Sequence, residues 1–542
     1  MGKRFNVDGL CYPDEHYMVN IDNRLEQIQT LIDDGKYFVM NRARQYGKTT
    51  TLHMLAQRFS SVYQIFSISF EGLGSSSYKD EWSFCRKVYG LLYDVIYYGE
   101  TSEVSDVIQT ECYHMSLNDA RPDLRTLSNF FSLICKESEK PVIFIIDEVD
   151  QASNQEVFLD FLAMLRDKYM KRRSRPTFRS VILAGVYDIK NLKLKIKKGK
   201  ESIYNSPWNI AAKFTVDMNF SPKDIAGMLT EYKDDRNAIM DIDAIAQLIY
   251  DYTGGYPFLV SRICQLAEEA TVESSGQSVS SATRLNEAPD NRYYKWTNDT
   301  ILDAVKQLLN EQNTLFDDMG KKLSDSRELD NIIRLILFNG KKIPYSPDEH
   351  AINLGTMFGY LKNEDGLVAV SNRIFETRLY NRYLSEDIAE NKLADTASFD
   401  RNQFTSGGIL NMDLVMKKFM IHFTEIYGDS DVSFLEEHGR RIFLTYLKPI
   451  INGVGNYYIE ARTRDLRRTD VVIDYLGQQQ VVEMKIWHGE EYNRRGELQL
   501  VRYLDDYALD KGYLLSFNFN KNKKTGMKEI HCNGKTILEV VV

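Results

Sequence analysis

The sequence has no long hydrophobic run and no closely paired cysteines. None of its apolar stretches approaches the roughly 20 residues that a membrane-spanning helix needs, so we expect no membrane partner. Its six cysteines are scattered without CxxC spacing, which argues against a zinc site and favours a reducing compartment. The first ten residues, MGKRFNVDGL, lack the apolar core of a secretory signal. We therefore expect a cytoplasmic protein.

An excess of positive charge is also missing. The chain has 77 acidic and 68 basic residues and a formal net charge of −9, so nucleic-acid binding would depend on local basic patches. Lysine and arginine cluster at residues 167–180 and 193–200, and again at Arg462, Arg464, Arg467, Arg468, Arg494 and Arg495. With 542 residues, and about 100 to 200 residues per domain, the chain is expected to form three or four domains.

A strand, loop and helix near the N-terminus predict a phosphate-binding loop. The apolar strand Tyr37–Met40 precedes the loop RARQYGKTT. Four residues at its end are expected to hold ATP: Gly47, Lys48, Thr49 and Thr50. In such a loop the lysine reaches the β and γ phosphates and the next hydroxyl binds Mg²⁺. The pattern GxxxxGK[ST] expects glycine where this sequence has Arg42, which puts the rate of hydrolysis in question more than nucleotide binding.

A second apolar strand, Val142–Ile146, ends in Asp147 and Glu148. Carboxylates at the carboxyl end of a buried parallel strand lie where α/β sheets bind ligands. We expect Asp147 to hold Mg²⁺, directly or indirectly, and Glu148 to orient or deprotonate the attacking water. A third strand lies in RSVILAGVYD, and the alternation of strands and helices over residues 37–190 predicts a doubly wound parallel sheet.

Residues 1–270 resemble AAA-like P-loop ATPases of the signal-transduction (STAND-type) branch. The resemblance lies in RARQYGKTT as Walker A, VIFIIDEVD as Walker B, and Gly255-Tyr256-Pro257, which is similar to the GxP motif of the helical lid. The segment Ser206–Ala211 looks like the one that precedes this lid. The resemblance implies a lid that closes over the nucleotide according to its phosphate state.

The middle of the chain resembles a winged helix-turn-helix module over residues 296–390, between linkers at 271–295 and 391–410. A helix begins in WTNDTILDAVKQLLNEQNTLF, with Thr297 or Asn298 as its N-cap. A helix, a hairpin turning at NEDG and a further helix follow. Such modules serve either as DNA contacts or as structural connectors, and the expected recognition helix carries few basic residues.

The C-terminal region, residues 411–542, predicts an α/β domain with charged residues on one strand face. Amphipathic helices are expected near Met412–Tyr427 and Phe434–Leu447. A hairpin turning around Gly477 and Gln478 would place Val472 opposite Glu483 and Asp470 opposite Lys485. Asp474 shares their face but lies nearer the turn, so Asp470 is preferred as the working acid. The alternative is a solvated strand face without chemistry.

The same residues resemble the PD-(D/E)xK, or restriction-endonuclease-like, superfamily. Asp470 is followed after twelve residues by Glu483-Met484-Lys485, although Thr469 stands where the motif has proline. Asp470, Glu483 and the Met484 carbonyl would bind Mg²⁺, and Lys485 would position the water or stabilise the developing anion. Gln499 and Tyr503, four residues apart on a helix, are similar to the QxxxY motif of exonuclease-like members. Three further acidic candidates stay open: Glu436, Glu437 and Glu460.

Together these patterns predict a multidomain α/β protein: a P-loop ATPase with a helical lid, a winged-helix-like module and a restriction-endonuclease-like domain. We expect an ATP-binding and ATP-hydrolysing protein with a Mg²⁺-dependent nuclease domain that cleaves DNA rather than RNA under nucleotide control. Its arrangement resembles bacterial defence or mobile-element proteins. The alternative is a nucleotide-switched interaction protein whose nuclease-like domain binds without cutting. A homo-oligomer is left open.

Overall fold

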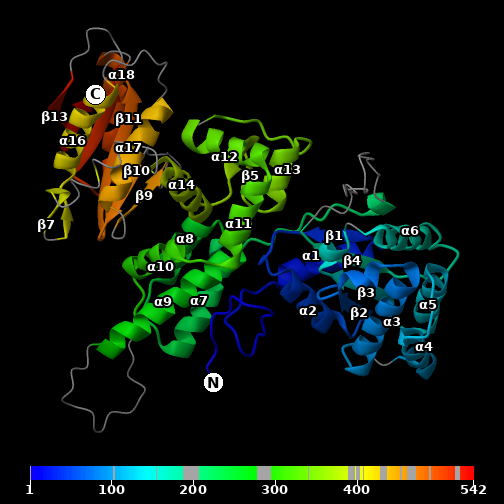
Figure 1. Cartoon of the computed structure of the whole chain (residues 1–542). Coiled ribbons are helices and arrows are strands. Elements are labelled where there is room, and N and C mark those ends of the chain that lie inside the picture. The colour runs from blue at the N-terminus through cyan, green and yellow to red at the C-terminus, as the bar shows by residue number, and fades with distance from the viewer. Residues whose placement is uncertain are drawn as a thin grey trace, which may run out of the picture. The chain divides into compact units, whose positions relative to one another are not determined.

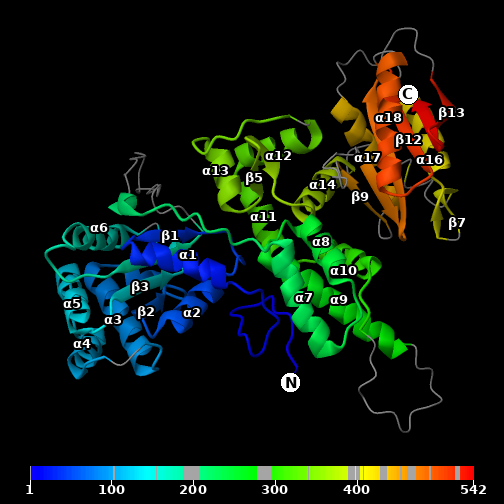
Figure 2. The ribbon, with the colours of Figure 1, turned by 180° about the vertical axis from the view of Figure 1, so that it is seen from behind.

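The computed structural model describes residues 2–101, 104–153, 155–186, 207–277, 294–339, 341–388, 397, 403–406, 408–427, 436–451, 455–459, 471–487, 490–518 and 525–542. The chain divides into two compact units (Figure 1; Figure 2 from behind). The first comprises Met1–Tyr250, Gly254–Trp296 and Leu354–Gly359. The second comprises Asp251–Thr253, Thr297–Asn353 and Tyr360–Val542.

The first unit is built on a four-stranded parallel sheet with strand order β1-β4-β3-β2. Its strands are β1 (Phe38–Asn41), β2 (Gln64–Ser69), β3 (Val142–Asp147) and β4 (Ser180–Gly185). Strands β3 and β4 are buried along their whole length, as expected for parallel strands covered on both faces. The predicted parallel sheet is therefore confirmed, with β2 as a strand that the sequence patterns did not single out.

Helices pack around this sheet (Figure 1). They are α1 (Asp22–Asp33), α2 (Lys48–Phe59), α3 (Glu81–Tyr97), α4 (Asp106–Ser116), α5 (Leu124–Glu137) and α6 (Glu156–Met170). One core joins alternate residues of β3, such as Phe144 and Ile146, to the apolar stripes of α3, α5 and α6. The opening of α2 directly after β1 places its N-terminus at the carboxyl edge of the sheet, where ligands bind in such folds.

Three further helices complete the first unit: α7 (Pro222–Arg236), α8 (Ile242–Thr253) and α9 (Pro257–Gln277). Ser221 and Asp224 form a capping box at the start of α7, with Pro222 in its first turn. Helix α9 continues to Gln277, so the beginning of the predicted linker over 271–295 is helical. A polar composition indicated a linker there, but polar residues continue a helix without difficulty once it has been nucleated.

The second unit begins with helices α10 (Asn298–Asn310), α11 (Thr314–Asp325) and α12 (Arg327–Asn339). Thr297 caps α10 through a capping box, which decides between the two predicted caps. Beyond α13 (His350–Met357), a hairpin of β5 (Leu361–Glu364) and β6 (Leu367–Val370) precedes α14 (Arg373–Ile388). Its two turn residues, Asp365 and Gly366, have φ of 52° and 83°, so the predicted turn at NEDG is confirmed.

A six-stranded mixed sheet follows, with order β13-β14-β12-β11-β10-β9. Its strands are β9 (Gly455–Ile459), β10 (Val471–Tyr475), β11 (Gln478–Ile486), β12 (Lys511–Phe517), β13 (Gly526–Cys532) and β14 (Lys535–Val541). Among the described strands of this second sheet, only the β11–β12 and β12–β14 pairs are parallel. Strand β11 lies between β12 and β10 inside the sheet, and its residues Val481 to Met484 are buried.

Helices cover both faces of this sheet (Figure 2). They are α16 (Met412–Tyr427), α17 (Glu436–Ile451) and α18 (Glu490–Asp506), and the first two agree with the predicted helices to within four residues. Phe517 of β12 faces α16 and α17, since its ring contacts Phe423 and leaves no room for a side chain at Gly439. Gly512, on the other face of β12, packs against Leu500 and Leu504 of α18.

The middle helices of the second unit pack against its C-terminal part. Lys448 of α17 donates a hydrogen bond from Nζ to Asn381 Oδ1 of α14 at 2.7 Å, and Tyr457 of β9 donates to the same oxygen at 3.4 Å. Burial lowers the pKa of Lys448 to about 8. Across the described parts of the chain, no helix has the length and apolar composition that crossing a bilayer requires.

Candidate nucleotide site and candidate catalytic cluster

The phosphate-binding loop connects β1 to α2 through two residues in the left-handed region. Gln45 has φ of 58° and Gly47 has φ of 72°, and the second value favours a residue without Cβ. Helix α2 begins at Lys48, directly after this turn. The unpaired backbone N–H groups of a helix N-terminus attract an anion, so the loop has the polarity that a polyphosphate requires.

Lys48 is buried at the base of this loop. Its Nζ donates to the carbonyl oxygens of Arg42 and Ala43, each at 3.0 Å. Burial lowers the pKa of Lys48, and the carboxylates of Glu148, Asp150 and Asp147 oppose this shift. The ammonium group is therefore held by neutral carbonyl groups and surrounded at longer range by negative charge, an environment suited to a phosphate with a bound cation.

Thr49 and Asp147 meet at the carboxyl edge of the sheet. Thr49 Oγ1 donates a hydrogen bond to Asp147 Oδ2 at 2.8 Å, while the backbone N–H of Glu148 donates to Asp147 Oδ1 at 2.8 Å. A hydroxyl beside a carboxylate forms the hard oxygen set that Mg²⁺ prefers, so these two residues fit the expected metal. Bound there with a nucleotide, the ion would neutralise charge on the phosphates.

Glu148 directly follows the buried strand β3, with φ of 53°. Burial, together with the negative charge of Asp147, raises the pKa of Glu148, and the charge of Lys48 acts in the opposite direction. A half-buried carboxylate with a raised pKa accepts a proton more readily than an exposed one. This position and this proton affinity suit the predicted role of activating a water molecule.

Asp150, which the sequence patterns did not single out, supports the edge of the sheet. Its Oδ2 accepts a hydrogen bond from the N–H of Val186 at 2.7 Å, and a Cβ at Gly185 would lie only 2.8 Å from its Oδ1. The carbonyl of Gly185 in turn accepts from the N–H of Arg42 at 3.1 Å. The end of β4 is thus bonded both to the Walker B segment and to the start of the P-loop.

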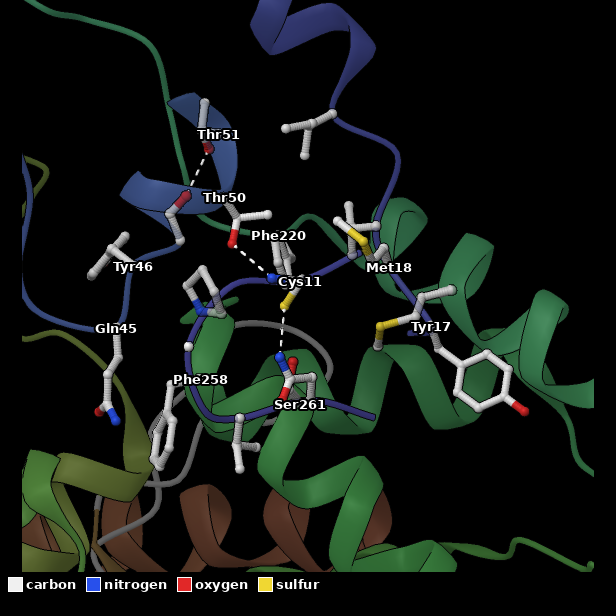
Figure 3. A pocket seen from close by; sticks show the side chains of 18 of the residues that line it. Cys11, Tyr17, Met18, Gln45, Tyr46, Thr50, Thr51, Phe220, Phe258 and Ser261 are labelled. Carbon is white, nitrogen blue, oxygen red and sulfur yellow. Dashed lines mark hydrogen bonds between the residues drawn. The ribbon is translucent and has the colours of Figure 1, made fainter. Parts of the chain in front are cut away.

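A cavity of about 210 Å³ opens beside the P-loop (Figure 3). Its lining comes from the loop and α2 (Gln45, Tyr46, Gly47, Thr50, Thr51), from the region of α7 and α9 (Phe220, Met228, Pro257, Phe258, Ser261), from the N-terminal segment (Asn6 to Gly9, Cys11, Tyr17 to Val19, Ile21) and from α1 (Arg24). Thr50 Oγ1 accepts a hydrogen bond from the N–H of Cys11 at 3.4 Å. The contribution of the N-terminal segment was missed, because no motif marks it and only the fold brings it to the loop.

Glu483 and Lys485 lie close together on β11 in the second unit. Lys485 Nζ is 2.9 Å from Glu483 Oε1, the Glu483 side chain is fully buried, and that of Lys485 is 15% exposed. Both point toward α18, since a Cβ at Gly496 would touch Lys485 Cγ at 3.5 Å. Met484 is also buried, and strand alternation places its side chain on the opposite face.

Gln499 and Tyr503 are hydrogen-bonded within α18, the helix that covers Glu483 and Lys485. Gln499 Nε2 donates to the Tyr503 hydroxyl at 2.7 Å, and Tyr503 is buried. The expected spacing of four residues on one helix face is therefore present as a direct contact. The four described residues of the predicted site thus lie as two bonded pairs, Glu483 with Lys485 on β11 and Gln499 with Tyr503 on α18.

The predicted register of the β10–β11 hairpin is wrong by two residues. Val472 pairs with Val481 and Val471 with Val482, whereas Glu483 was predicted opposite Val472. The turn consists of Leu476 and Gly477, with φ of 53° and 81°, one position earlier than expected. Moving the turn by one residue changes each pairing by two, so the side chains keep their faces.

Several predicted residues lie outside the described part of the chain. These are Asp470, Glu460, the arginines Arg462, Arg464, Arg467 and Arg468, and residues 193–200. Glu436 and Glu437 begin α17, but their side chains are not described. Among the described residues, no group of three or more His, Cys, Asp or Glu side chains is arranged to hold a metal ion. The predicted pairing of Asp470 with Glu483 around Mg²⁺ stays a prediction.

Asp474, the rejected alternative acid, has a local structural role. It is fully buried, and its Oδ1 accepts a hydrogen bond from the N–H of Gly477 at 3.1 Å, which closes the hairpin turn. Lys306 of α10 lies 3.7 Å from the same oxygen. These contacts give the Oδ1 oxygen of Asp474 a structural role at the hairpin turn.

Comparison with known proteins bears on the first unit. Residues 18–194 match a family described as Predicted AAA-ATPase. No curated protein matches the chain. A Walker-type ATPase of Pyrococcus abyssi is 13% identical, with 69% of this chain and 99% of that chain covered and a TM-score of 0.46. The ORC2 protein of Aeropyrum pernix, in ADPNP and ADP complexes, is 14% identical, with 69% of this chain and 97% of that chain covered and a TM-score of 0.40.

The RuvB Holliday junction branch migration motor of Thermotoga maritima is 11% identical, with 65% of this chain and 92% of that chain covered and a TM-score of 0.30. The assignment of the domain does not depend on these three structures. It depends on the matched sequence and on the geometry around Lys48, Thr49 and Asp147. The N-terminal region of this chain is an AAA-ATPase-like P-loop domain.

Proposed function

We propose that this protein uses ATP binding and hydrolysis in its first unit to control a Mg²⁺-dependent phosphodiesterase in its second unit, with DNA as the substrate. The observation that carries the nuclease proposal is the Glu483–Lys485 pair, 2.9 Å apart beneath a helix with bonded Gln499 and Tyr503. A solvated strand face offers no reason to bury a carboxylate and a lysine together, because burying charge costs free energy.

The order of elements around this pair supports the same proposal. Helices α16 and α17 precede strands β9, β10 and β11, and α18 and β12 follow them. Helices, three strands and then the helix with Gln499 and Tyr503 is the order that the sequence predicts beside its resemblance to PD-(D/E)xK nucleases. In this reading Glu483 would bind Mg²⁺, and Lys485 would position the water or stabilise charge on the scissile phosphate.

The second candidate function is nucleic-acid binding without cleavage, with ATP as the switch. Complete burial of the Glu483 side chain favours it, since a buried carboxylate paired with lysine must exchange that partner before it binds a metal ion. The two candidates make different predictions for the same assay, because only the first requires Lys485 for product formation.

The test is a cleavage assay on plasmid DNA, linear DNA and single-stranded RNA with Mg²⁺, with and without ATP. Wild type is compared with Lys485→Ala and Lys48→Ala. The matched control is Lys511→Ala, which removes a lysine from the same sheet and breaks an ion pair with Asp413 at 2.7 Å. We expect Lys485→Ala to reduce cleavage at least about 100-fold and Lys511→Ala to cut like the wild type.

Each outcome separates the proposals. Cleavage that survives Lys485→Ala contradicts the nuclease assignment. Retarded DNA migration without product in the wild type supports binding without cutting. Cleavage that depends on Lys485 but responds neither to ATP nor to Lys48→Ala removes the control by nucleotide and leaves the cutting chemistry in place.

A further inference from the structure

We infer that Arg42, which occupies the first glycine position of the P-loop pattern, is a positioning residue that couples the phosphate-binding loop to the helical lid. The inference rests on the proposed use of ATP by the first unit. It assigns a role to the one residue at which the loop departs from the expected motif.

The side chain of Arg42 is directed to the segment that leads into the lid. Its Nη2 donates a hydrogen bond to the carbonyl of Val216 at 2.8 Å, and its guanidinium carbon lies 5.1 Å from the centre of the Phe214 ring. Its Nη1 donates to the carbonyl of its neighbour Asn41 at 3.0 Å. Residues 214–219 lead directly into α7, so this arginine connects the start of the P-loop with the start of the lid.

Two further loop residues make contacts of the same kind. The hydroxyl of Tyr46 donates to Asn219 Oδ1 at 2.9 Å, and the Tyr46 ring lies 4.4 Å from the Tyr256 ring. The hydroxyl of Tyr256 donates to the carbonyl of Arg44 at 2.6 Å. Alternate residues of the loop, at positions 42, 44 and 46, therefore each bond to the lid or to the segment before it.

Arg42 also belongs to the phosphate site through its backbone. Its carbonyl accepts a hydrogen bond from Lys48 Nζ at 3.0 Å, and its N–H donates to the carbonyl of Gly185 at 3.1 Å. Lys48 Nζ also donates to the carbonyl of Ala43 at 3.0 Å, so a turn of Lys48 toward a phosphate would weaken its bonds to two successive loop carbonyls, that of Arg42 among them. Arg42 is thus bonded to Lys48 through its carbonyl and to Val216, in the segment before α7, through its guanidinium group.

This arrangement explains why arginine is tolerated where the motif has glycine. Its guanidinium group is held by the carbonyls of Asn41 and Val216 and lies over the Phe214 ring, and none of these contacts involves the residues at 45–48 where the loop turns into α2. A ligand shifts a conformational equilibrium only through contacts that differ between the two states. The Lys48–Arg42–Val216 connection supplies such contacts between the phosphates and the lid.

The test measures nucleotide affinity, turnover and hydrogen exchange on the full-length chain. Arg42→Gly, which restores the motif, should keep ATP affinity within about threefold, because the loop's backbone and Lys48 remain. Turnover should fall about tenfold, and the ATP-dependent protection of residues 214–220 from exchange should be lost. Arg42→Lys should recover part of this protection, since an ammonium group replaces one donor of the guanidinium fork.

Two further variants separate coupling from simple loss of structure. Tyr46→Phe keeps the ring contact with Tyr256 but removes the bond to Asn219, so it should weaken ATP-dependent protection less than Arg42→Gly. Arg24→Lys alters an arginine of α1 that reaches the same segment, at Asn219 O and above the Phe220 ring, without passing through the P-loop. It should lower protection equally with and without ATP.

One outcome overturns this inference but leaves the proposed function standing. In it the wild type binds ATP, and Arg42→Gly retains both wild-type turnover and ATP-dependent protection of residues 214–220. A wild type that binds no ATP removes the proposed function as well. A drop in protection for Arg42→Gly that is identical with and without ATP also overturns the inference, because it indicates a purely structural role.

Discussion

The two candidate sites each contain a lysine with little exposure to solvent and an acidic side chain, but the contacts of the lysine differ between them. In the first unit Lys48 donates to two backbone carbonyls, and Asp147 is bonded to the hydroxyl of Thr49. In the second unit Lys485 is paired directly with Glu483. Neutral carbonyls release an ammonium group to a phosphate more easily than a carboxylate does. The first site is therefore organised to receive an anion, whereas the second must first exchange an internal partner.

The strongest test of this comparison concerns the acid that follows β3. Glu148→Gln should reduce ATP turnover by about 10² to 10⁴ while leaving ATP affinity nearly unchanged, as expected for a lost general base. A base works only when deprotonated, and the pKa of Glu148 is raised by burial and by Asp147. Wild-type turnover should therefore fall with decreasing pH from a point above the ordinary glutamate value of about 4.3.

The measurement is steady-state ATP turnover across pH, with Glu71→Gln as the control. Glu71 is an exposed acid whose charge also acts on Glu148. Because the charge of Glu71 raises the pKa of Glu148, its loss should move the acid limb of the turnover profile to slightly lower pH and leave the plateau unchanged. Equal turnover in Glu148→Gln and wild type at the plateau contradicts the assignment of Glu148 as the base.

A smaller effect is expected at the Thr49 hydroxyl, the predicted ligand of Mg²⁺. Thr49→Val keeps the shape of the side chain but removes the donor to Asp147 Oδ2. ATP affinity measured by calorimetry with Mg²⁺ should fall about tenfold, or about 1.4 kcal/mol, whereas affinity in EDTA should hardly change. Thr30→Val, on the exposed face of α1, is the control. An equal loss of affinity with and without Mg²⁺ would show that Thr49 contacts the nucleotide rather than the ion.

A last effect, on stability rather than on nucleotide chemistry, concerns Lys448, which has no carboxylate partner among its described contacts. The pKa of Lys448 is lowered from 10.5 to about 8 by burial. Between these values the unfolded chain binds more protons than the folded one, so the second unit should gain stability as pH rises from about 8 to about 10.5. Thermal unfolding followed over this range should show a rising Tm.

Lys448→Met should remove that rise, and Lys511→Met, at a partly exposed lysine paired with Asp413, should retain it. A Tm that rises with pH equally in Lys448→Met and wild type would assign the titration to another group.

Local sequence signals predicted the elements that carry both sites. Five apolar residues followed by Asp147 predicted β3, and the alternatives Thr297 and Asn298 placed the cap of α10 to within one residue, because burial patterns and caps depend on neighbouring residues. The hairpin at Leu476 and Gly477 was placed one residue late. Leucine at positive φ is uncommon, so nothing in the local sequence favoured that turn.

The N-terminal lining of the cavity and the Arg42–Val216 bond join residues far apart in the chain, so no local pattern predicts them. By itself the sequence determined which side chains are available at each site and on which strand or helix they lie, because spacing sets the face. Only the tertiary structure decided that Lys48 rests on carbonyls while Lys485 rests on a carboxylate. The local sequence does not determine which group contacts a buried charge, because that group depends on how the other helices and strands pack around it.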